Sequence, residues 1–330
     1  MKLPRRNFLR FAAGAAALPA LSRVAMAQSY PSRPVTMIVP FPAGGATDVI
    51  ARIMAERMRG LLGQVVIVEN SFGGAGGSIG VGRAARAAPD GHTVCIGHWQ
   101  TFVTNGATYA LPYDLVNDFE PISLIVDSPQ FIVSKNAVPA KDLRELIAWL
   151  KANPGKALAG SPGSGSPAHI AGVYFQKITD TRFQFVPYRG AAQAIQDLLA
   201  GQIDIIITNA SAALPLLRNG TIRAYAVTAK TRMSTAPDVL TVDEAGLPRF
   251  YFSLWHGFWV PKGTPKSIIA RLNAAVVESL AEPAVRSRFA GLGQEIFPRE
   301  QQTPEMLAAF QKAEIEKWWP IIKAAGIKAE

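Results

Sequence analysis

The sequence predicts an α/β protein made of two lobes, each a mostly parallel sheet flanked by helices. From Pro34 onward, short apolar runs alternate with amphipathic stretches of helical periodicity, a pattern typical of parallel sheets with right-handed crossovers. A second set of the same kind begins near residue 128. The chain ends in a helical stretch without strands, so we expect it to pack on the first lobe. The first lobe therefore comprises residues 28–127 plus 252–330, and the second comprises residues 128–251.

The first lobe begins with an apolar strand over 35–39, followed by a Gly/Pro turn. Apolar residues recur at helical spacing over 50–61, which predicts an amphipathic helix. Further strands are expected at 65–68 and 93–96, with a helix over 78–88 between them. This alternation of strand and helix predicts one parallel sheet.

The second lobe shows the same alternation of strands and helices. The predicted strands are 130–134, 157–160, 182–187 and 203–207, and the predicted helices are 142–152, 167–178 and 191–199. Gly201 follows the last of these helices, where a glycine commonly ends a helix. The aromatic segment 250–260 then leads back to the first lobe.

Residues 1–27 are predicted to be an export signal that is cleaved after Ala27. The pair Arg5-Arg6 precedes an apolar run over 11–21, and the segment ends at Ala25-Met26-Ala27. A basic start, a short apolar core and a small-residue cleavage site are the three parts of a secretory signal. The order Arg-Arg-x-Phe-Leu indicates the twin-arginine pathway, with an ordinary Sec signal as the alternative. Either route predicts a protein of the periplasm.

Composition argues against several classes of protein. The formal charge of +10 falls to +5 once the five basic residues of the signal are removed, and no Lys/Arg-rich run indicates nucleic-acid binding. Cys95 is the single cysteine, so no intramolecular disulfide can form and no lipid anchor is expected. No apolar run approaches the ~20 residues that span a bilayer, so we expect a soluble exported protein.

Residues 40–48, Pro-Phe-Pro-Ala-Gly-Gly-Ala-Thr-Asp, form a first glycine loop between the first strand and the first helix. Ligands of open α/β sheets bind at the carboxyl ends of strands, and glycines let backbone N–H groups approach them closely. Thr47 or Asp48 can cap the helix, whose N-terminus favours an anion. A capped turn without a ligand is the alternative, and this loop alone does not decide between the two.

A second glycine loop spans residues 160–169, Gly-Ser-Pro-Gly-Ser-Gly-Ser-Pro-Ala-His, and it also joins a strand to a helix. Ser166 is a suitable N-cap and Pro167 a favoured first helical residue, with the Ser164 hydroxyl nearby. His169 falls in the first turn, where packing or capping is a commoner role than a ligand contact. Two such loops, one in each lobe, predict a ligand site between the lobes.

The usual signatures of catalysis are missing. The sequence has no Gly-x-x-x-x-Gly-Lys phosphate loop and no Gly-x-Ser-x-Gly nucleophile motif. The histidines at 92, 98, 169 and 256 lack metal-ligand spacing. Cys95 lies in an apolar strand, which is typical of a buried inert thiol. We therefore expect no enzyme activity, no metal and no cofactor.

Several residues near predicted strand ends could determine which ligand is selected. They are His98, Trp99, Gln100, Asn209, Trp255 and His256. For the loop residues among them, satisfying nearby backbone groups is the commoner role. Core packing explains Trp255 about as well as a place in a pocket wall.

The motifs together carry a family resemblance that covers the mature chain. The matching segments are 40–48, Val68-Glu69-Asn70 with its following glycine cluster, 111–114, 118–122, 160–169, 186–190, 197–204 and 261–265. In this order they resemble the substrate-binding proteins of tripartite tricarboxylate transporters, the Bug family of periplasmic receptors. No single segment is specific, whereas the set is.

The resemblance implies a two-lobed periplasmic binding protein of type II-like architecture that closes by a hinge, with its ligand in the interlobe cleft. Members hold a ligand carboxylate with backbone amides of the first loop, partly through water, and the second loop adds contacts. The ligand-binding residues implied here are Phe41, Ala43, Gly44, Gly45, Asp48, Gly163, Ser164, Gly165, Ser166 and His169. The implied ligand is a di- or tricarboxylate or a related organic acid.

The resemblance also implies a partner, the membrane permease of a tripartite tricarboxylate-type transporter, which a monomeric receptor would supply. A receptor that feeds a signalling partner is one alternative, and an α/β enzyme acting on organic acids is another. The segment His98-Trp99-Gln100 and His256 are bulkier or more polar than expected at such positions. The ligand class therefore follows from the resemblance, and the ligand itself does not.

Overall fold

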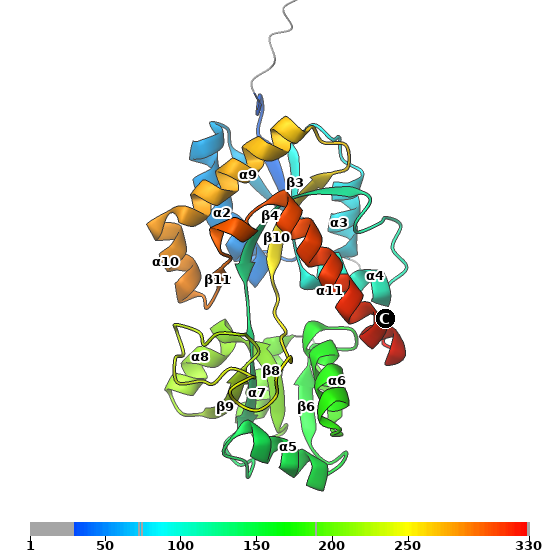
Figure 1. Cartoon of the computed structure of the whole chain (residues 1–330), viewed down its shortest axis with the longest axis vertical. Helices are drawn as coiled ribbons and strands as arrows, with labels where there is room; N and C mark the ends of the chain where they lie inside the picture. Colours follow the sequence, from blue (N-terminus) through cyan, green and yellow to red (C-terminus); the bar gives the residue numbers. More distant parts are fainter. Residues whose placement is uncertain (1–29, 72, 74, 189, 329–330) are drawn as a thin grey trace, which may run out of the picture.

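The computed structural model describes residues 30–328 apart from positions 72, 74 and 189, and these residues form two lobes joined end to end (Figure 1). The predicted export signal, residues 1–27, lies outside the described residues. Within the described ranges, no helix has the length and apolar character needed to cross a membrane. The predicted two-lobed α/β fold is confirmed.

The first lobe contains a six-stranded sheet in the order β11-β4-β10-β3-β1-β2. Its strands are β1 (Val35–Val39), β2 (Val66–Asn70), β3 (Thr93–His98), β4 (Phe119–Asp127), β10 (His256–Pro261) and β11 (Glu295–Ile296). Strands β1, β2 and β3 are parallel, whereas β10 runs antiparallel to both β3 and β4. The sheet is therefore mixed, because β4 leaves this lobe and β10 returns to it in the opposite direction.

The second lobe contains a five-stranded sheet in the order β7-β6-β8-β5-β9. Its strands are β5 (Gln130–Lys135), β6 (Leu158–Ser161), β7 (Gln184–Pro187), β8 (Ile205–Asn209) and β9 (Ile222–Val227). Strand β6 is parallel to β7 and β8, and β5 is antiparallel to β8 and β9. The expectation of mostly parallel sheets is therefore wrong for this lobe too, since the entering strand β5 inserts between β8 and β9.

Helices flank both sheets (Figure 1). They are α2 (Ala46–Leu62), α3 (Ser78–Ala85), α4 (Asn105–Thr108), α5 (Leu143–Ala152), α6 (Pro167–Thr179), α7 (Ala191–Leu199), α8 (Ala210–Arg218), α9 (Lys266–Ala281), α10 (Pro283–Gly291) and α11 (Pro304–Ala324). Short helical turns lie at Ala75–Gly77, Gln100–Thr104 and Arg299–Gln301. Strand β9 and helix α8 had no counterpart in the sequence prediction.

The last three helices pack on the first lobe. Helices α9 and α10 join α2 over one core cluster, which includes Met54, Leu272 and Phe289. The cluster that includes α11 is aromatic, with Trp99, Trp259 and Trp318 fully buried. Because α11 also contacts the second lobe through Tyr174 and Trp318, whose rings lie 5.3 Å apart, the C-terminal helix helps to hold the lobes together.

Two connections join the lobes and lie side by side. One runs from β4 to β5, and the other precedes β10. Pro129 and Ser253 form a bridge between them, and the Leu254 N–H donates to the Ser128 carbonyl at 3.0 Å. The chain therefore crosses between the lobes twice, along two hydrogen-bonded neighbouring segments.

Candidate functional site

The first glycine loop joins β1 to α2 at the carboxyl edge of the first sheet. Gly44 has φ +83°, a left-handed conformation that favours glycine. The helix is capped by Gly45 without a side-chain cap, so the expectation that Thr47 or Asp48 is the N-cap is wrong. Asp48 lies three residues further and its carboxylate accepts the Gly44 N–H at 2.8 Å. The loop thus folds back on the first turn of its own helix.

Asp48 is held inside the protein, with 2% of its surface exposed. Its carboxylate accepts hydrogen bonds from Arg52 Nε and Asn70 Nδ2, both at 2.9 Å. Burial by itself would raise the pKa of Asp48, but the hydrogen bonds from Arg52, Gly44 and Asn70 outweigh it and lower the pKa to about 2. Asp48 is therefore an ionised group that shapes the loop. Asn70, which the sequence indicated only as part of a family motif, supports the loop through this carboxylate.

Two histidines lie beneath the first loop. The His98 ring stacks on Phe41, with ring centres 4.6 Å apart, and meets the His256 ring edge-on at 5.3 Å. His256 Nε2 lies 3.1 Å from Thr47 Oγ1. Both ends of the loop therefore contact imidazole rings supplied by neighbouring strands.

The second glycine loop joins β6 to α6 and is closed by local contacts. Gly163 and Gly165 have φ of +100° and +73°. Ser166 is the N-cap, as predicted, and its hydroxyl accepts the His169 N–H at 3.3 Å. Burial lowers the pKa of His169. Ser164 reaches the other lobe, where its hydroxyl donates to the Lys328 carbonyl at 3.2 Å.

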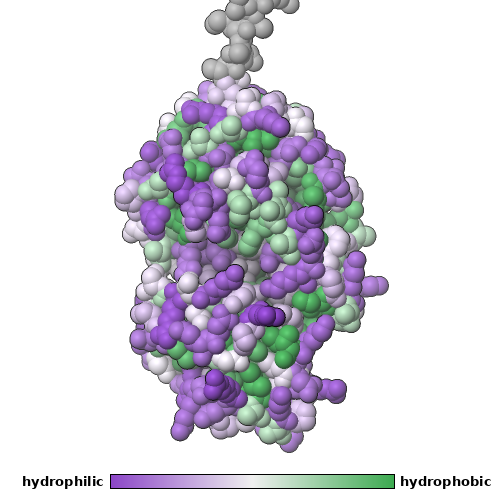
Figure 2. All heavy atoms as spheres, viewed as in Figure 1, coloured by the Kyte–Doolittle hydropathy of each residue, from purple (hydrophilic) through white to green (hydrophobic). Residues whose placement is uncertain are grey.

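A cavity of about 350 Å³ lies between the lobes. Gly44 and Ala46 line it from the first lobe, together with the start of α2, and Asn209 and Ser211 line it from the second lobe at the start of α8. Figure 2 shows the surface of the molecule hollowed at the level where the lobes meet. Of the predicted site residues, Gly44 and Asn209 thus face a shared cavity, whereas residues 163–169 do not line it.

Helix α8 is the part of this cavity that sequence reasoning missed. Asn209, the last residue of β8, caps α8 by accepting the Ala212 N–H at 3.0 Å and the Ser211 hydroxyl at 2.9 Å. The first turn of a helix leaves N–H groups without intrahelical partners, and these groups favour anions. Two such helix starts, α2 and α8, line the cavity from opposite lobes. The Asn-x-Ser spacing at 209–211 after an apolar strand was the available signal for α8.

The aromatic candidates occupy the core instead of a cleft surface. Trp99 and Trp255 are fully buried, and their rings pack in the aromatic cluster with Phe252 and Phe310. Core packing, the alternative for Trp255, is what the structure shows. Gln100 begins a π-helical turn after β3, and its backbone N–H donates to His98 Nδ1 at 3.0 Å.

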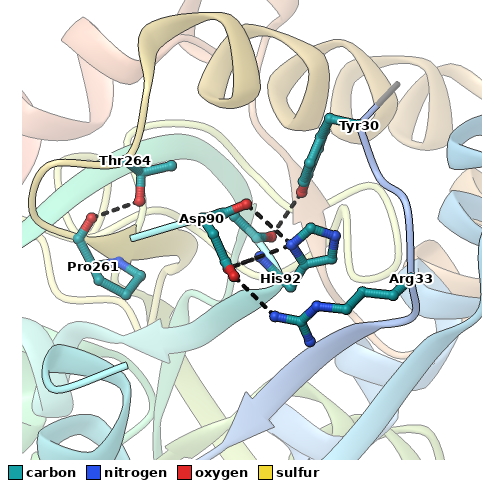
Figure 3. A network of polar contacts seen from close by, with 7 residues as sticks. Tyr30, Arg33, Asp90, His92, Pro261 and Thr264 are labelled. Carbon is teal, nitrogen blue, oxygen red and sulfur yellow. Dashed lines mark hydrogen bonds and ion pairs between the residues drawn. The ribbon is translucent and has the colours of Figure 1, made fainter. Parts of the chain in front are cut away.

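His92 belongs to a separate network that directly precedes the first residue of β3 (Figure 3). Its backbone N–H donates to Asp90 at 2.9 Å, and Arg33 pairs with the same carboxylate at 2.8 Å. Tyr30 donates to the Gly91 carbonyl at 2.7 Å. These contacts attach the start of the described chain to the first lobe, so they are structural.

Two further features of the described residues concern metal binding and thiol chemistry. No cluster of three or more His, Cys, Asp or Glu residues suited to a metal ion is present within it. Cys95 is completely buried, and burial raises the pKa of its thiol.

Comparison with known proteins agrees with this geometry. The model of the tripartite tricarboxylate transporter family receptor matches residues 50–327. The periplasmic binding protein BugD is 38% identical with a TM-score of 0.76, and the alignment covers 91% of this chain and all of BugD.

Two further solved relatives contain organic acids. MatC from Rhodopseudomonas palustris, with bound malate, is 36% identical with a TM-score of 0.76, covering 89% of this chain and all of MatC. Rpa4515 from R. palustris, with adipate, is 31% identical with a TM-score of 0.78, covering 91% of this chain and 99% of that protein. The chain therefore belongs to the receptor family of the tripartite tricarboxylate transporters, a family that includes periplasmic binding proteins.

Proposed function

We propose that the protein is a periplasmic receptor that captures a di- or tricarboxylate, or a related small organic acid, between its lobes. The observation that carries this proposal is the cavity lined by the first turns of α2 and α8 from opposite lobes. Helix N-termini and glycine-loop amides bind an anion without a buried arginine, whose desolvation would be costly. The acids bound by MatC and Rpa4515 support the same ligand class.

We assign binding of the ligand carboxylate to backbone groups of the first loop. Phe41, Ala43, Gly44 and Gly45 supply this loop, and Asp48 fixes its shape through the Gly44 N–H. The second loop does not line the cavity, and we assign it further ligand contacts once the lobes close, through Gly163, Ser164, Gly165, Ser166 and His169. His98, Gln100 and Asn209 remain the candidates for reading the rest of the ligand, and Trp99 and Trp255 are no longer among them because both lie in the core.

Ligand capture is expected to use the hinge. A ligand that contacts both lobes stabilises the closed arrangement by its extra contacts there. The monomeric receptor would then deliver the acid to the permease of a tripartite tricarboxylate-type transporter, after export and cleavage following Ala27. A receptor of this kind would bind the acid and release it chemically unchanged.

A thermal-shift screen of residues 28–330 against succinate, malate, adipate and citrate tests the function. An acid present at 100 times its Kd should add about 2.7 kcal/mol to the free energy of unfolding. Calorimetry should then give saturable binding, and the recovered acid should be chemically unchanged. A panel in which no carboxylate raises the melting temperature would contradict the proposal, and conversion of the acid would favour the enzyme alternative.

A further inference from the structure

His98 and His256 form a cross-strand pair at the edge of the first sheet. They lie directly opposite each other in the antiparallel register of β3 and β10. His98 is 7% exposed and His256 is 3% exposed. Burial lowers the pKa of His98 to about 4, and burial together with the proximity of His98 lowers the pKa of His256 well below its usual value. Both rings are therefore neutral near pH 7.

The orientation of the His98 ring is fixed from its own turn. Its Nδ1 accepts the Gln100 N–H at 3.0 Å, which places the proton of the neutral ring on Nε2. The Thr101 hydroxyl accepts the His98 N–H at 2.9 Å and donates to the His98 carbonyl at 3.0 Å. The face that His98 presents to Phe41 is thus set by the backbone of the π-helical turn.

Each histidine contacts one end of the first glycine loop. His98 stacks on Phe41 at the start of the loop, and His256 hydrogen-bonds Thr47 at its end. Thr47 is 5% exposed, so its hydrogen bond is shielded from water. Gly44 and Gly45 lie between these two contacts. Without such contacts, glycine backbones could adopt many conformations.

His256 also lies next to the hinge. It is the first residue of β10, directly after the connection that returns from the second lobe. The Trp99 N–H donates to the Trp255 carbonyl at 3.1 Å, which joins the residues adjacent to both histidines. The pair therefore lies between the hinge and the loop.

We propose that His98 and His256 are positioning residues of the ligand site, which hold the first glycine loop in its binding conformation through Phe41 and Thr47. The proposal rests on the proposed function of this loop. Backbone donors bind an anion well only when they are held close to the productive geometry. Loss of either contact should therefore weaken ligand binding although neither imidazole needs to touch the ligand.

The test compares Thr47→Val with Thr47→Ser, measured by calorimetry with malate and adipate as probes. Valine keeps the shape of threonine without the hydroxyl, and serine keeps the hydroxyl. Thr47→Val should raise the Kd about tenfold, the size of one hydrogen bond, and Thr47→Ser should stay within about twofold of wild type. In a double variant with His256→Phe, the Thr47→Val effect should largely disappear, since its partner is already gone.

Thr264→Val is the matched control, because Thr264 is equally buried and donates to the Pro261 carbonyl at 2.7 Å at the opposite end of β10 (Figure 3). It should lower the melting temperature without changing the Kd. If Thr47→Val binds like wild type, or if the Thr47→Val and His256→Phe effects on the Kd simply multiply, the positioning role is overturned. If the wild-type protein binds no acid of the wider panel, both the proposed function and the positioning role are wrong. Normal wild-type binding with an unaffected Thr47→Val variant would overturn the positioning role alone.

Discussion

The two glycine loops follow the same local design and differ in how they are supported. The first loop is braced from other strands, by Asn70 on β2, His98 on β3 and His256 on β10. The second loop is supported by its own helix cap at Ser166 and by the His169 ring, which lies 4.5 Å from the Phe185 ring on β7. The Ser164 hydroxyl also donates to the Lys328 carbonyl of the other lobe. The first loop is thus contacted by side chains of three other strands, and we expect substitutions in it to affect ligand binding more than substitutions in the second loop.

The largest expected effect comes from Gly44→Asp in the braced loop. Gly44 has φ +83°, where other residues are strained by roughly 1–2 kcal/mol, and a new carboxylate would repel an anionic ligand. We expect the Kd to rise on the order of a hundredfold or more, measured by calorimetry. Gly63→Asp is the control, because Gly63 has φ +73° at the far end of the same helix. Retained affinity in Gly44→Asp would contradict the site.

An intermediate effect is expected from Asp48→Asn. The folded-state pKa of about 2 lies below the ordinary value of 3.8, so the carboxylate stabilises the folded state above pH 4 and loses this contribution as the pH falls toward 2. The variant should lose about 1–2 kcal/mol of unfolding free energy at pH 7, with allowance for the exposed Arg52 partner.

The difference between wild type and Asp48→Asn, measured by denaturant unfolding, should shrink between pH 4 and pH 2. Asp142→Asn serves as the control, because Asp142 caps α5 in the other lobe and asparagine caps equally well. A gap between wild type and Asp48→Asn that stays constant over this pH range would show that the Asp48 network is not the cause.

The smallest effect is expected from Ser166→Ala in the second glycine loop. Loss of an N-cap costs about 1 kcal/mol, and because residues 163–169 do not line the interlobe cavity, the affinity should fall only about twofold to fivefold. Thr303→Ala removes the cap of α11, where Thr303 accepts the Met306 N–H at 3.2 Å, and should cost similar stability without any change in the Kd. An affinity loss for Ser166→Ala as large as that for Gly44→Asp would remove the distinction between the loops.

Local sequence patterns predicted much of the fold and part of the candidate site. The apolar run 35–39, the cap and proline at Ser166 and Pro167, and Gly201 with φ +78° act through neighbours in the chain, so their roles could be read directly. Strand β9 was missed because its pairing with β5 is non-local. The prediction of Thr47 or Asp48 as N-cap is wrong because α2 begins at Ala46, so both residues lie inside its first turn, where their side chains contact His256 and Asn70.

The sequence by itself determined the alternation of strands and helices, the two glycine loops and the family resemblance, since each depends on spacing along the chain. Only the tertiary structure decided that Trp99 and Trp255 belong to the core, and that α8 shares a cavity with the first loop. It also decided that His98 and His256 meet, although they are far apart in sequence. The physical reason is that burial, pKa and pairing depend on which strands become neighbours, and a sheet whose strands leave one lobe and return to it from the other brings distant residues together.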